Sequence, residues 1–351
     1  MNVLTFEIPT DEPESDGTLE WESTAVVVVQ VEADGQAGLG YTYADAAAAQ
    51  LIESKLAPLI DDHDPMAPPA TWMRMRAALR NAGQQGLGAM AISAVDIALW
   101  DLKAKLLGIS LADALPRFHA AVPIYGSGGF TSYSLERLQE QLRGWVEQGL
   151  RRVKIKVGRN PAADPERLDA AREAIGPDVE LMVDANGAFD RVEALRWAQR
   201  YRDEWNVTWF EEPVSSEDLE GMAFVRDHSP PGVAIAAGEY AWDLADLARM
   251  ARCVDVLQAD VTRCGGVSAF IRADGIARAH GIPLSAHCAP AASMHACCAC
   301  ESLAHLEYFH DHVRVERMLF EGVAAPSGAA LHPSAEPGLG LALAPVGSEA
   351  A

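Results

Sequence analysis

The sequence predicts an α/β protein: a closed barrel of eight parallel strands alternating with helices, preceded by a smaller α+β unit. Short apolar, β-branched stretches recur from residue 122 onward with helical patterns between them, and strands that alternate with helices form right-handed βαβ units. The length of 351 residues exceeds that of a usual single domain and leaves room for the companion unit. The expected barrel strands are residues 122–127, 152–157, 180–184, 208–212, 234–239, 254–260, 282–287 and 305–309.

The N-terminal unit is expected to begin with antiparallel strands. Residues 25–31 form a β-branched run, Asp34 and Gly35 are a hairpin signal, and residues 37–41 supply the returning strand. The acidic segment 11–17 is expected to be a mobile loop, because its charges cannot pack in a core. Residues 87–107 carry apolar side chains at steps of three and four, which predicts a helix that ends at Gly108.

Helical patterns also fill the gaps between the barrel strands, for example at residues 135–148, 192–205 and 267–280. The segment after residue 320 is rich in Gly, Pro and Ala and is expected to return to the first unit. The predicted domains are therefore residues 1–117, 118–320 and 321–351.

Composition and charge restrict the possible partners. No apolar run approaches the roughly 20 residues that cross a bilayer, and the first residues lack the features of a signal peptide, so a cytoplasmic protein is expected. The formal net charge of -22 disfavours binding to nucleic acid or to anionic membranes, because the field repels polyanions. A small anionic substrate held by local cations is still compatible with this charge.

All six cysteines lie in the last third of the chain and are expected to be buried thiols rather than disulfides. Cys297, Cys298 and Cys300 with His295 offer a zinc site as an alternative. The segment reads as a helix of small residues, however, and it has no second cysteine pair at zinc-finger spacing.

The strand at residues 152–157 is the centre of the predicted function. Its apolar residues alternate with Lys154 and Lys156, so both lysines share one face. If this face lines a barrel, desolvation and mutual repulsion would lower the pKa of both amines toward that of a useful base. Taken alone, the pattern favours a half-exposed strand with a solvated lysine face, and the strands that follow reverse that preference.

Three consecutive strands end in carboxylates: Asp184, Glu211 and Glu239. Active sites of parallel barrels form where the strands finish, so these side chains are expected at one rim. Three carboxylates without an adjacent Cys or His are oxygen ligands of the kind that Mg²⁺ prefers. Helix capping could explain any one of these carboxylates, but not the presence of one at the end of each of three consecutive strands.

The last strands add an acid and base set. Asp260 and His287 end neighbouring strands, where the aspartate could fix the tautomer of the imidazole and raise its basicity. Glu307, in the eighth strand, is a further acid. His305, His310 and His312 are weaker candidates, expected to be surface or hydrogen-bonded polar residues.

The order Lys-x-Lys, Asp-x-Asn, Glu-Glu-Pro, Gly-Glu, Asp and His on successive strands resembles the mandelate racemase-like branch of the enolase superfamily. The resemblance covers nearly the whole chain and implies a modified TIM barrel, (β/α)7β, under an α+β capping domain. It also implies a homo-oligomer, although no residue here shows one.

The resemblance implies a role for each of these residues. Asp184, Glu211 and Glu239 would be Mg²⁺ ligands, and Glu212 would support them. Lys156 would be the base on one face of a carboxylate substrate, and His287, paired with Asp260, the acid or base on the other. Lys154 would contact the substrate carboxylate, and Glu307 would hydrogen-bond it as it becomes an enediolate.

Such a site abstracts the proton α to a carboxylate. The expected reaction is dehydration of a sugar acid to a 2-keto-3-deoxy acid, and the alternative is racemisation or epimerisation of a 2-hydroxy acid. A metal-dependent hydrolase would need clustered histidines early in the barrel, whereas His63 and His119 are far apart. A non-catalytic binder of sugar acids is disfavoured because the catalytic set is complete.

The substrate itself is not predicted, and mono- and di-acids both stay open. Thr18, Leu19, Trp21 and the segment 41–43 are candidate substrate contacts, because capping loops close over the substrate in the family that the chain resembles. Arg159, directly after the lysine strand, is a candidate to bind a second carboxylate of the substrate, and its position is the one feature that suggests this.

Overall fold

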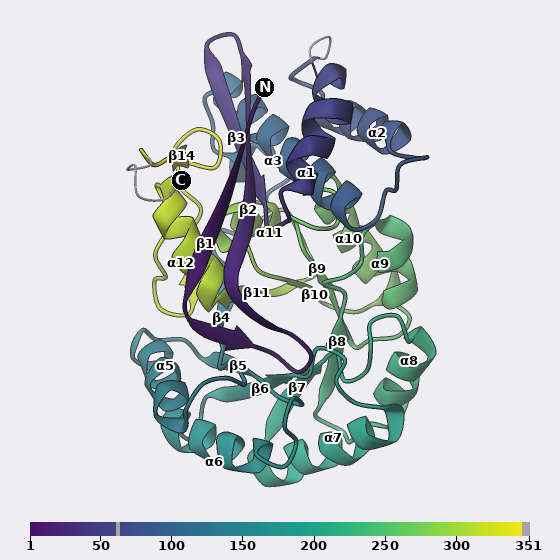
Figure 1. Ribbon diagram of the computed structural model, residues 1–351, viewed down its shortest axis with the longest axis vertical. Helices are drawn as coiled ribbons and strands as arrows, with labels where there is room; N and C mark the ends of the chain where they lie inside the picture. Colours follow the sequence, from purple (N-terminus) through teal and green to yellow (C-terminus); the bar gives the residue numbers. More distant parts are fainter. Residues whose placement is uncertain (61–63, 346–351) are drawn as a thin grey trace.

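The computed structural model describes residues 1–60 and 64–345 (Figure 1). Eight parallel strands form a barrel that closes because its last strand, β11, pairs with its first, β4. The strands are β4 (Val122–Gly128), β5 (Arg152–Lys156), β6 (Glu180–Asp184), β7 (Val207–Glu211), β8 (Ala234–Ala237), β9 (Val256–Ala259), β10 (Leu284–Ala286) and β11 (Leu303–Phe309). The predicted barrel is therefore confirmed, with some strands shorter than expected.

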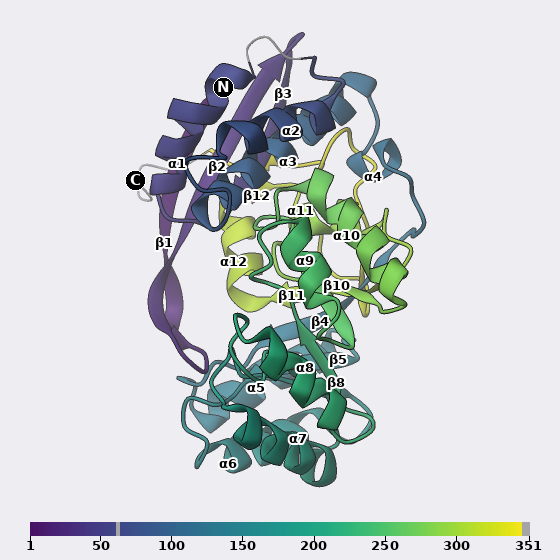
Figure 2. The ribbon, with the colours of Figure 1, turned by 90° about the vertical axis from the view of Figure 1, so that its right-hand side faces the viewer.

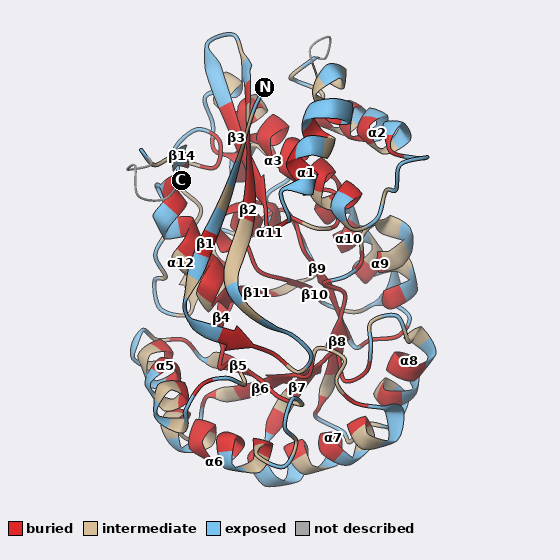
Figure 3. Cartoon of the chain, viewed as in Figure 1, coloured by how far each residue is buried: buried red, intermediate tan, exposed pale blue. Residues whose placement is uncertain are grey.

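Helices surround the barrel, and one follows each strand (Figures 1 and 2). They are α5 (Leu135–Glu147), α6 (Asp164–Ile175), α7 (Arg191–Trp205), α8 (Leu219–His228), α9 (Leu244–Met250), α10 (Val267–His280), α11 (Pro290–Cys297) and α12 (His310–Leu319). Several begin with side-chain caps; Asp190, for example, accepts hydrogen bonds from the N–H groups of Val192 and Glu193 at the start of α7. The inner faces of most of them are buried and their outer faces carry the exposed residues, whereas α11 is buried along its whole length (Figure 3).

The N-terminal unit is a three-stranded antiparallel sheet with helices: β1 (Asn2–Ser15), β2 (Glu20–Ala33), β3 (Gln36–Thr42), α1 (Ala47–Leu51), α2 (Pro68–Ala78), α3 (Leu87–Leu107) and α4 (Leu111–Ala114). The turn at Asp34 and Gly35 is present, with φ of 49° and 76°. Helix α3 ends at Gly108 in the left-handed conformation, as expected. It packs so closely on β3 that a Cβ on Gly40 would lie 2.1 Å from the carbonyl oxygen of Ala94.

The expectation of a mobile loop at residues 11–17 is wrong. Strand β1 continues to Ser15, and Glu14, Ser15 and Asp16 are buried. Most of their polar groups have partners: Trp21 donates to Oε2 of Glu14, and Asp16 accepts from the N–H groups of Thr18 and Leu19, whereas Oε1 of Glu14 has no partner among the described residues. An acidic segment can be buried here because these hydrogen bonds replace those with water.

The C-terminal segment lies against both units. Strand β12 (Phe320–Glu321) pairs with β14 (Ala342–Leu343), and β13 (Ala330–Leu331) pairs with β4. Gly338 donates to the carbonyl of Ile109, and Leu339 donates to the carboxylate of Asp101 in α3. The domain boundaries at 117 and 320 stay predictions of the sequence. No helix among the described residues is long and apolar enough to cross a membrane.

Candidate active site

The predicted site residues gather at the carboxyl ends of the barrel strands. Lys156, Asp184 and Glu211 are register neighbours across β5, β6 and β7. The hairpin of β1 and β2 reaches this rim, since a Cβ on Gly17 at its tip would lie 2.1 Å from the carbonyl of Ala185 (Figure 1). The site is therefore enclosed by the barrel below and by the N-terminal unit above.

The two lysines are buried in ion pairs with the carboxylates. Lys154 Nζ lies 2.7 Å from both oxygens of Glu211 and 2.8 Å from Oε1 of Glu307. Lys156 Nζ lies 2.6 Å from Oδ2 of Asp184.

The expectation that the pKa of both lysines is lowered is wrong. Burial is the largest single influence and opposes the charged form of each amine. The surrounding acids together outweigh it and raise both pKa values, with Glu211 the strongest of them for Lys154 and Asp184 for Lys156. Sequence reasoning placed the lysines together but did not weigh the acids of the neighbouring strands against their mutual repulsion.

The imidazole of His287 lies between several acids. Its Nδ1 is 2.7 Å from Oδ2 of Asp260, the contact expected from neighbouring strands. Its Nε2 is 2.8 Å from Glu239 and 3.5 Å from Glu307. Burial disfavours the imidazolium, yet the acidic groups around it, Cys288, Glu239 and Glu307, raise the pKa of His287 well above its usual value.

Four acids at the ends of β6, β7 and β8 form a buried negative cluster: Asp184, Glu211, Glu212 and Glu239. Burial and the neighbouring Asp184 raise the pKa of Glu211 to about 8. Burial and Glu239 raise the pKa of Glu212 well above its usual value. The cluster thus carries more acid than its surroundings can keep ionised, and its donors are all oxygens, so the residues present fit a hard divalent cation such as Mg²⁺.

The three predicted metal ligands are nevertheless not gathered at one point. Asp184 and Glu211 form ion pairs with the two lysines, whereas Glu239 forms ion pairs with His287 and Arg263. Within residues 1–60 and 64–345, the groups of acidic, His or Cys side chains that are close enough to share an ion are His287 with Cys288 and Glu307, and Asp11 with Glu14 and His310.

Backbone strain marks the same rim. Asn186, Glu212, Cys288 and Ala289 all have positive φ, between 39° and 49°, although none is a glycine. Each follows a barrel strand closely, and such strain in non-glycine residues persists only where the surrounding structure enforces it. These turns hold the side chains at the strand ends in fixed directions.

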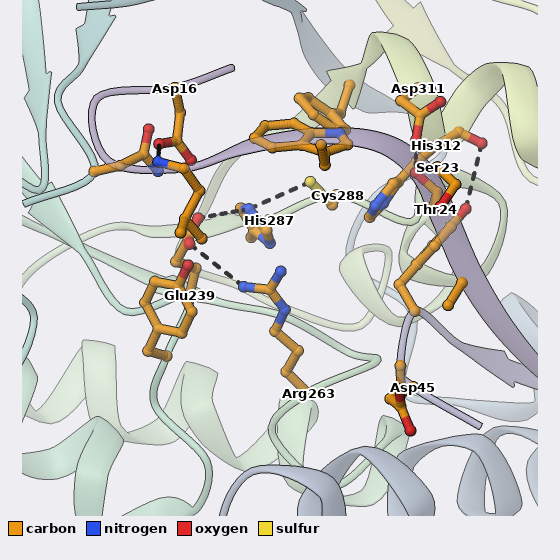
Figure 4. A pocket seen from close by; sticks show the side chains of 18 of the residues that line it. Asp16, Ser23, Thr24, Asp45, Glu239, Arg263, His287, Cys288, Asp311 and His312 are labelled. Carbon is orange, nitrogen blue, oxygen red and sulfur yellow. Dashed lines mark hydrogen bonds and ion pairs between the residues drawn. The ribbon is translucent and has the colours of Figure 1, made fainter. Parts of the chain in front are cut away.

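A cavity of about 320 Å³ opens above the site (Figure 4). Lys156 and His287 line it from the barrel, and Leu19, Trp21 and Tyr43 line it from the N-terminal unit. Of the other candidate contacts, Thr18, Tyr41, Thr42 and Arg159 are not among the residues that line it. Arg159 instead pairs with Glu20 at 2.8 Å.

Sequence reasoning missed several residues that line this cavity. Arg263 lies 3.4 Å from Glu239 and packs over the ring of Tyr240. Cys288 contacts His287 directly. His312, expected to be a minor polar residue, has a hydrogen bond from Ala289 and also stacks on Tyr43. Arg263 and Cys288 follow strand-end residues closely in the chain, and this closeness is the sequence feature that could have identified them.

Comparisons with known proteins agree with this architecture. Residues 6–115 match the mandelate racemase/muconate lactonizing enzyme N-terminal domain, and residues 137–346 match the enolase C-terminal domain-like family. L-talarate/galactarate dehydratase of Salmonella typhimurium is 33% identical over 293 residues, which cover 81% of this chain and 73% of that protein.

Two solved structures are similar over almost their whole length. A mandelate racemase/muconate lactonizing enzyme-like protein from Rubrobacter xylanophilus superimposes with a TM-score of 0.97 at 62% identity, covering 98% of this chain and 96% of that one. A racemase from Streptomyces coelicolor with bound magnesium gives a TM-score of 0.90 at 29% identity, covering 97% and 96%.

The curated relatives are sugar-acid dehydratases and cycloisomerases, and neighbouring structures hold magnesium. This protein is accordingly a magnesium-dependent enzyme of the dehydratase type, with isomerase relatives. Because both family models match and together span most of the sequence, the chain belongs to the mandelate racemase/muconate lactonizing enzyme branch of the enolase superfamily.

Proposed function

We propose that this enzyme dehydrates a sugar monocarboxylic acid to its 2-keto-3-deoxy acid. The observation that carries the proposal is that Lys156 and His287 line one cavity from β5 and β10. In the closed barrel these strands are separated by β4 and β11 on one side and by β6 to β9 on the other. A base and an acid can therefore act on different faces of one bound substrate.

In the proposed reaction Lys156 takes the proton α to the substrate carboxylate. Lys154 contacts the carboxylate oxygens as negative charge develops on them, and Glu307, 2.8 Å from its Nζ, holds the ammonium group in place. His287 then donates the proton of its Nε2 to the departing β-hydroxyl, which leaves as water, and the resulting enol becomes the 2-keto acid. Asp260 holds the imidazole through Nδ1 and stabilises its charged form.

The residues at the strand ends suit this chemistry when a metal ion is bound. Asp184, Glu211 and Glu239 would hold Mg²⁺, which would supply Lewis-acid stabilisation of the substrate carboxylate and would offset the negative charge that raises the pKa of Lys156. The raised pKa of His287 keeps its imidazole protonated at neutral pH, which is the form that an acid requires.

The charge of the cavity favours a single carboxylate. Among its described lining residues, the permanent cations are Lys156 and Arg263, and both are held by acids of the barrel. The remaining charged lining groups include Asp16, Asp45 and Asp311 (Figure 4). Carboxylates accept hydrogen bonds from hydroxyls but repel a second carboxylate, so a polyhydroxylated mono-acid fits better than a di-acid.

Turnover of a panel of sugar acids with Mg²⁺ tests the proposal, with the 2-keto product trapped as its semicarbazone. The expected result is keto-acid formation from aldonates and little or none from the matching aldarates. Efficient turnover of an aldarate such as galactarate would contradict the mono-acid preference, and the absence of any keto acid would contradict dehydration.

Epimerisation of a 2-hydroxy acid is the second candidate, because an acid and a base that both reach the α-carbon can return the proton to the opposite face. The magnesium-bound racemase among the structural neighbours supports this alternative. Incorporation of deuterium from D₂O at the α-carbon, with inversion and without keto acid, would identify it. A homo-oligomer and a cytoplasmic location stay predictions.

A further inference from the structure

A compact group of three side chains with a sulfur donor lies at the base of the cavity. Cys288 Sγ is 3.3 Å from His287 Nε2, a contact that Figure 4 shows, and 3.3 Å from Glu307 Oε2. The His287 Nε2 and Glu307 Oε2 atoms are 3.5 Å apart. Cys288 and His287 both line the cavity, so a solute can reach them. His287 and Cys288 directly follow β10, and Glu307 lies within β11.

These separations match one face of a tetrahedral zinc site. With Zn–S near 2.3 Å and Zn–N or Zn–O near 2.05 Å, tetrahedral angles place the sulfur about 3.6 Å from the other donors and the nitrogen about 3.4 Å from the oxygen. The observed edges differ from these values by about 0.3 Å or less. An ion could bind all three donors with little rearrangement and keep its fourth position toward the cavity.

The surrounding contacts orient the donor atoms toward such an ion. Asp260 binds Nδ1 of His287 at 2.7 Å and so directs Nε2 to the cavity side, where Glu239, 2.8 Å from Nε2, must give way when the ion binds. A carboxylate on the far nitrogen is the usual support of a metal-binding histidine. Lys154 binds Oε1 of Glu307 at 2.8 Å, keeps this carboxylate ionised and leaves Oε2 for the ion.

We propose that His287, Cys288 and Glu307 form a second metal site, which takes a thiophilic divalent ion such as Zn²⁺ or Cd²⁺. Mg²⁺ does not compete well there, because a thiolate is a poor ligand for a hard cation. Binding releases the protons of the Cys288 thiol and of His287 Nε2 to solvent, and the metal takes their places. An ion at this site therefore blocks the nitrogen that handles the substrate proton and inhibits the enzyme.

The site is tested by titrating the magnesium-loaded protein with Cd²⁺ while the near-ultraviolet thiolate-to-cadmium charge-transfer band and the heat of binding are recorded. We expect one Cd²⁺ per chain with a thiolate band in the wild type. Cys288→Ser replaces the soft donor by a hard one of similar size and should lose the band and about 100-fold in affinity. The matched control is Cys253→Ser, a buried thiol after α9 that should keep both.

A thiolate band that persists in Cys288→Ser, or a wild type without one, would overturn the proposal. Inhibition is compared as each variant's rate relative to its own rate without Cd²⁺, and Cys288→Ser should need about 100-fold more Cd²⁺. Equal sensitivity of both proteins would place the ion on the magnesium ligands instead and refute the site. If Cys288→Ser fails to fold, Cys288→Ala serves in the same titration. The band needs no substrate, so it tests the site whether or not the proposed dehydration is right.

Discussion

Lys156 carries its proton because of the carboxylates that the neighbouring strands bring to it. Alone on its strand it would be a desolvated amine with a second lysine two residues away, but Asp184 lies 2.6 Å from its Nζ. The same contact compensates the buried charge of the aspartate. Strand β5 thus supplies the proposed base, Lys156, and the neighbouring strand β6 supplies Asp184, which determines its protonation state.

Lys156→Ala should lower kcat by about 10³-fold or more, since it removes the proposed base. Folding should be retained, as judged by circular dichroism, and calorimetric titration should show that Mg²⁺ still binds. Arg152→Ala is the matched control, because Arg152 lies on the same strand and pairs with Glu180 outside the cavity. Near-normal turnover in Lys156→Ala would show that another group removes the proton.

Glu239→Gln should weaken Mg²⁺ binding at least about 10-fold, because an amide is a poorer ligand than a carboxylate for a hard cation. Isothermal titration with Mg²⁺ measures the change. Glu301→Gln, at a surface acid paired with Arg278, controls for the loss of one negative charge. Unaltered affinity in Glu239→Gln would count against its role as a ligand.

At the scale of elements, the hairpin of β1 and β2 joins the N-terminal unit to the barrel rim. Gly17 at its tip lies so close to the carbonyls of Ala185 and Val157 that a Cβ would meet them at 2.1 and 2.9 Å. Both carbonyls directly follow site residues on β6 and β5. The hairpin therefore rests on the same backbone that positions the lysine and its acid.

Gly17→Ala should displace the tip of the hairpin and raise KM or lower kcat at least several-fold, while the midpoint of thermal unfolding changes little. Gly35→Ala is the matched control at the other turn of the sheet, where nothing lies within 4 Å of an added Cβ. That control bears only the backbone strain of a φ of 76° and should leave the kinetics unchanged. Identical kinetic effects in both variants would show that contact with the rim is unimportant.

Glu14 makes the free energy of unfolding depend on pH. Burial raises its pKa to about 9 in the folded protein, above its usual value of 4.5. A raised pKa means that the folded state binds the proton more tightly, so the contribution of Glu14 to the free energy of unfolding is greatest below pH 4.5 and falls as the pH rises toward 9.

Glu14→Gln keeps an oxygen for the Trp21 hydrogen bond and cannot ionise. It should raise the free energy of unfolding at pH 8 by on the order of 2 kcal/mol, with little effect at pH 4. Urea denaturation at several pH values measures this. A constant difference between the two proteins at all pH values would show that Glu14 does not titrate in this range.

The hairpin also shows where prediction from sequence stopped. The alternation of strand and helix predicted the barrel, and the strand ends predicted the acids, because both depend on local periodicity. Burial of Glu14 and Asp16 depends on Trp21 and on backbone N–H groups that only the folded hairpin brings together. The positions of Arg263 and Cys288 likewise depend on turns that follow the strands, whose direction the sequence pattern does not encode.

At the scale of the whole molecule, negative charge is concentrated where the metal is expected. The chain has a formal charge of -22, and six carboxyl groups on or directly after the barrel strands are buried around the site, near Lys154, Lys156 and Arg263. The buried acids are Asp184, Glu211, Glu212, Glu239, Asp260 and Glu307. A divalent cation would relieve this excess in the folded state, whereas the unfolded chain has no such site.

Mg²⁺ should therefore stabilise the protein by mass action, by about 2.7 kcal/mol when its concentration is 100 times Kd. Differential scanning calorimetry with and without a chelator should show a higher unfolding temperature with the metal. Ca²⁺ at equal concentration controls for general ionic effects and should raise the temperature less. An unfolding temperature that does not respond to Mg²⁺ would contradict a folded-state binding site.

The contact of Leu339 with Asp101 can form only late in synthesis. All eight barrel strands lie between residues 122 and 309, so they leave the ribosome before the segment that completes the packing of α3. A nascent chain can close its barrel while the earlier unit still lacks its final partner. Translation that halts shortly after residue 321 would accordingly yield a protein with a complete barrel and an N-terminal unit that lacks its contacts with the C-terminal segment.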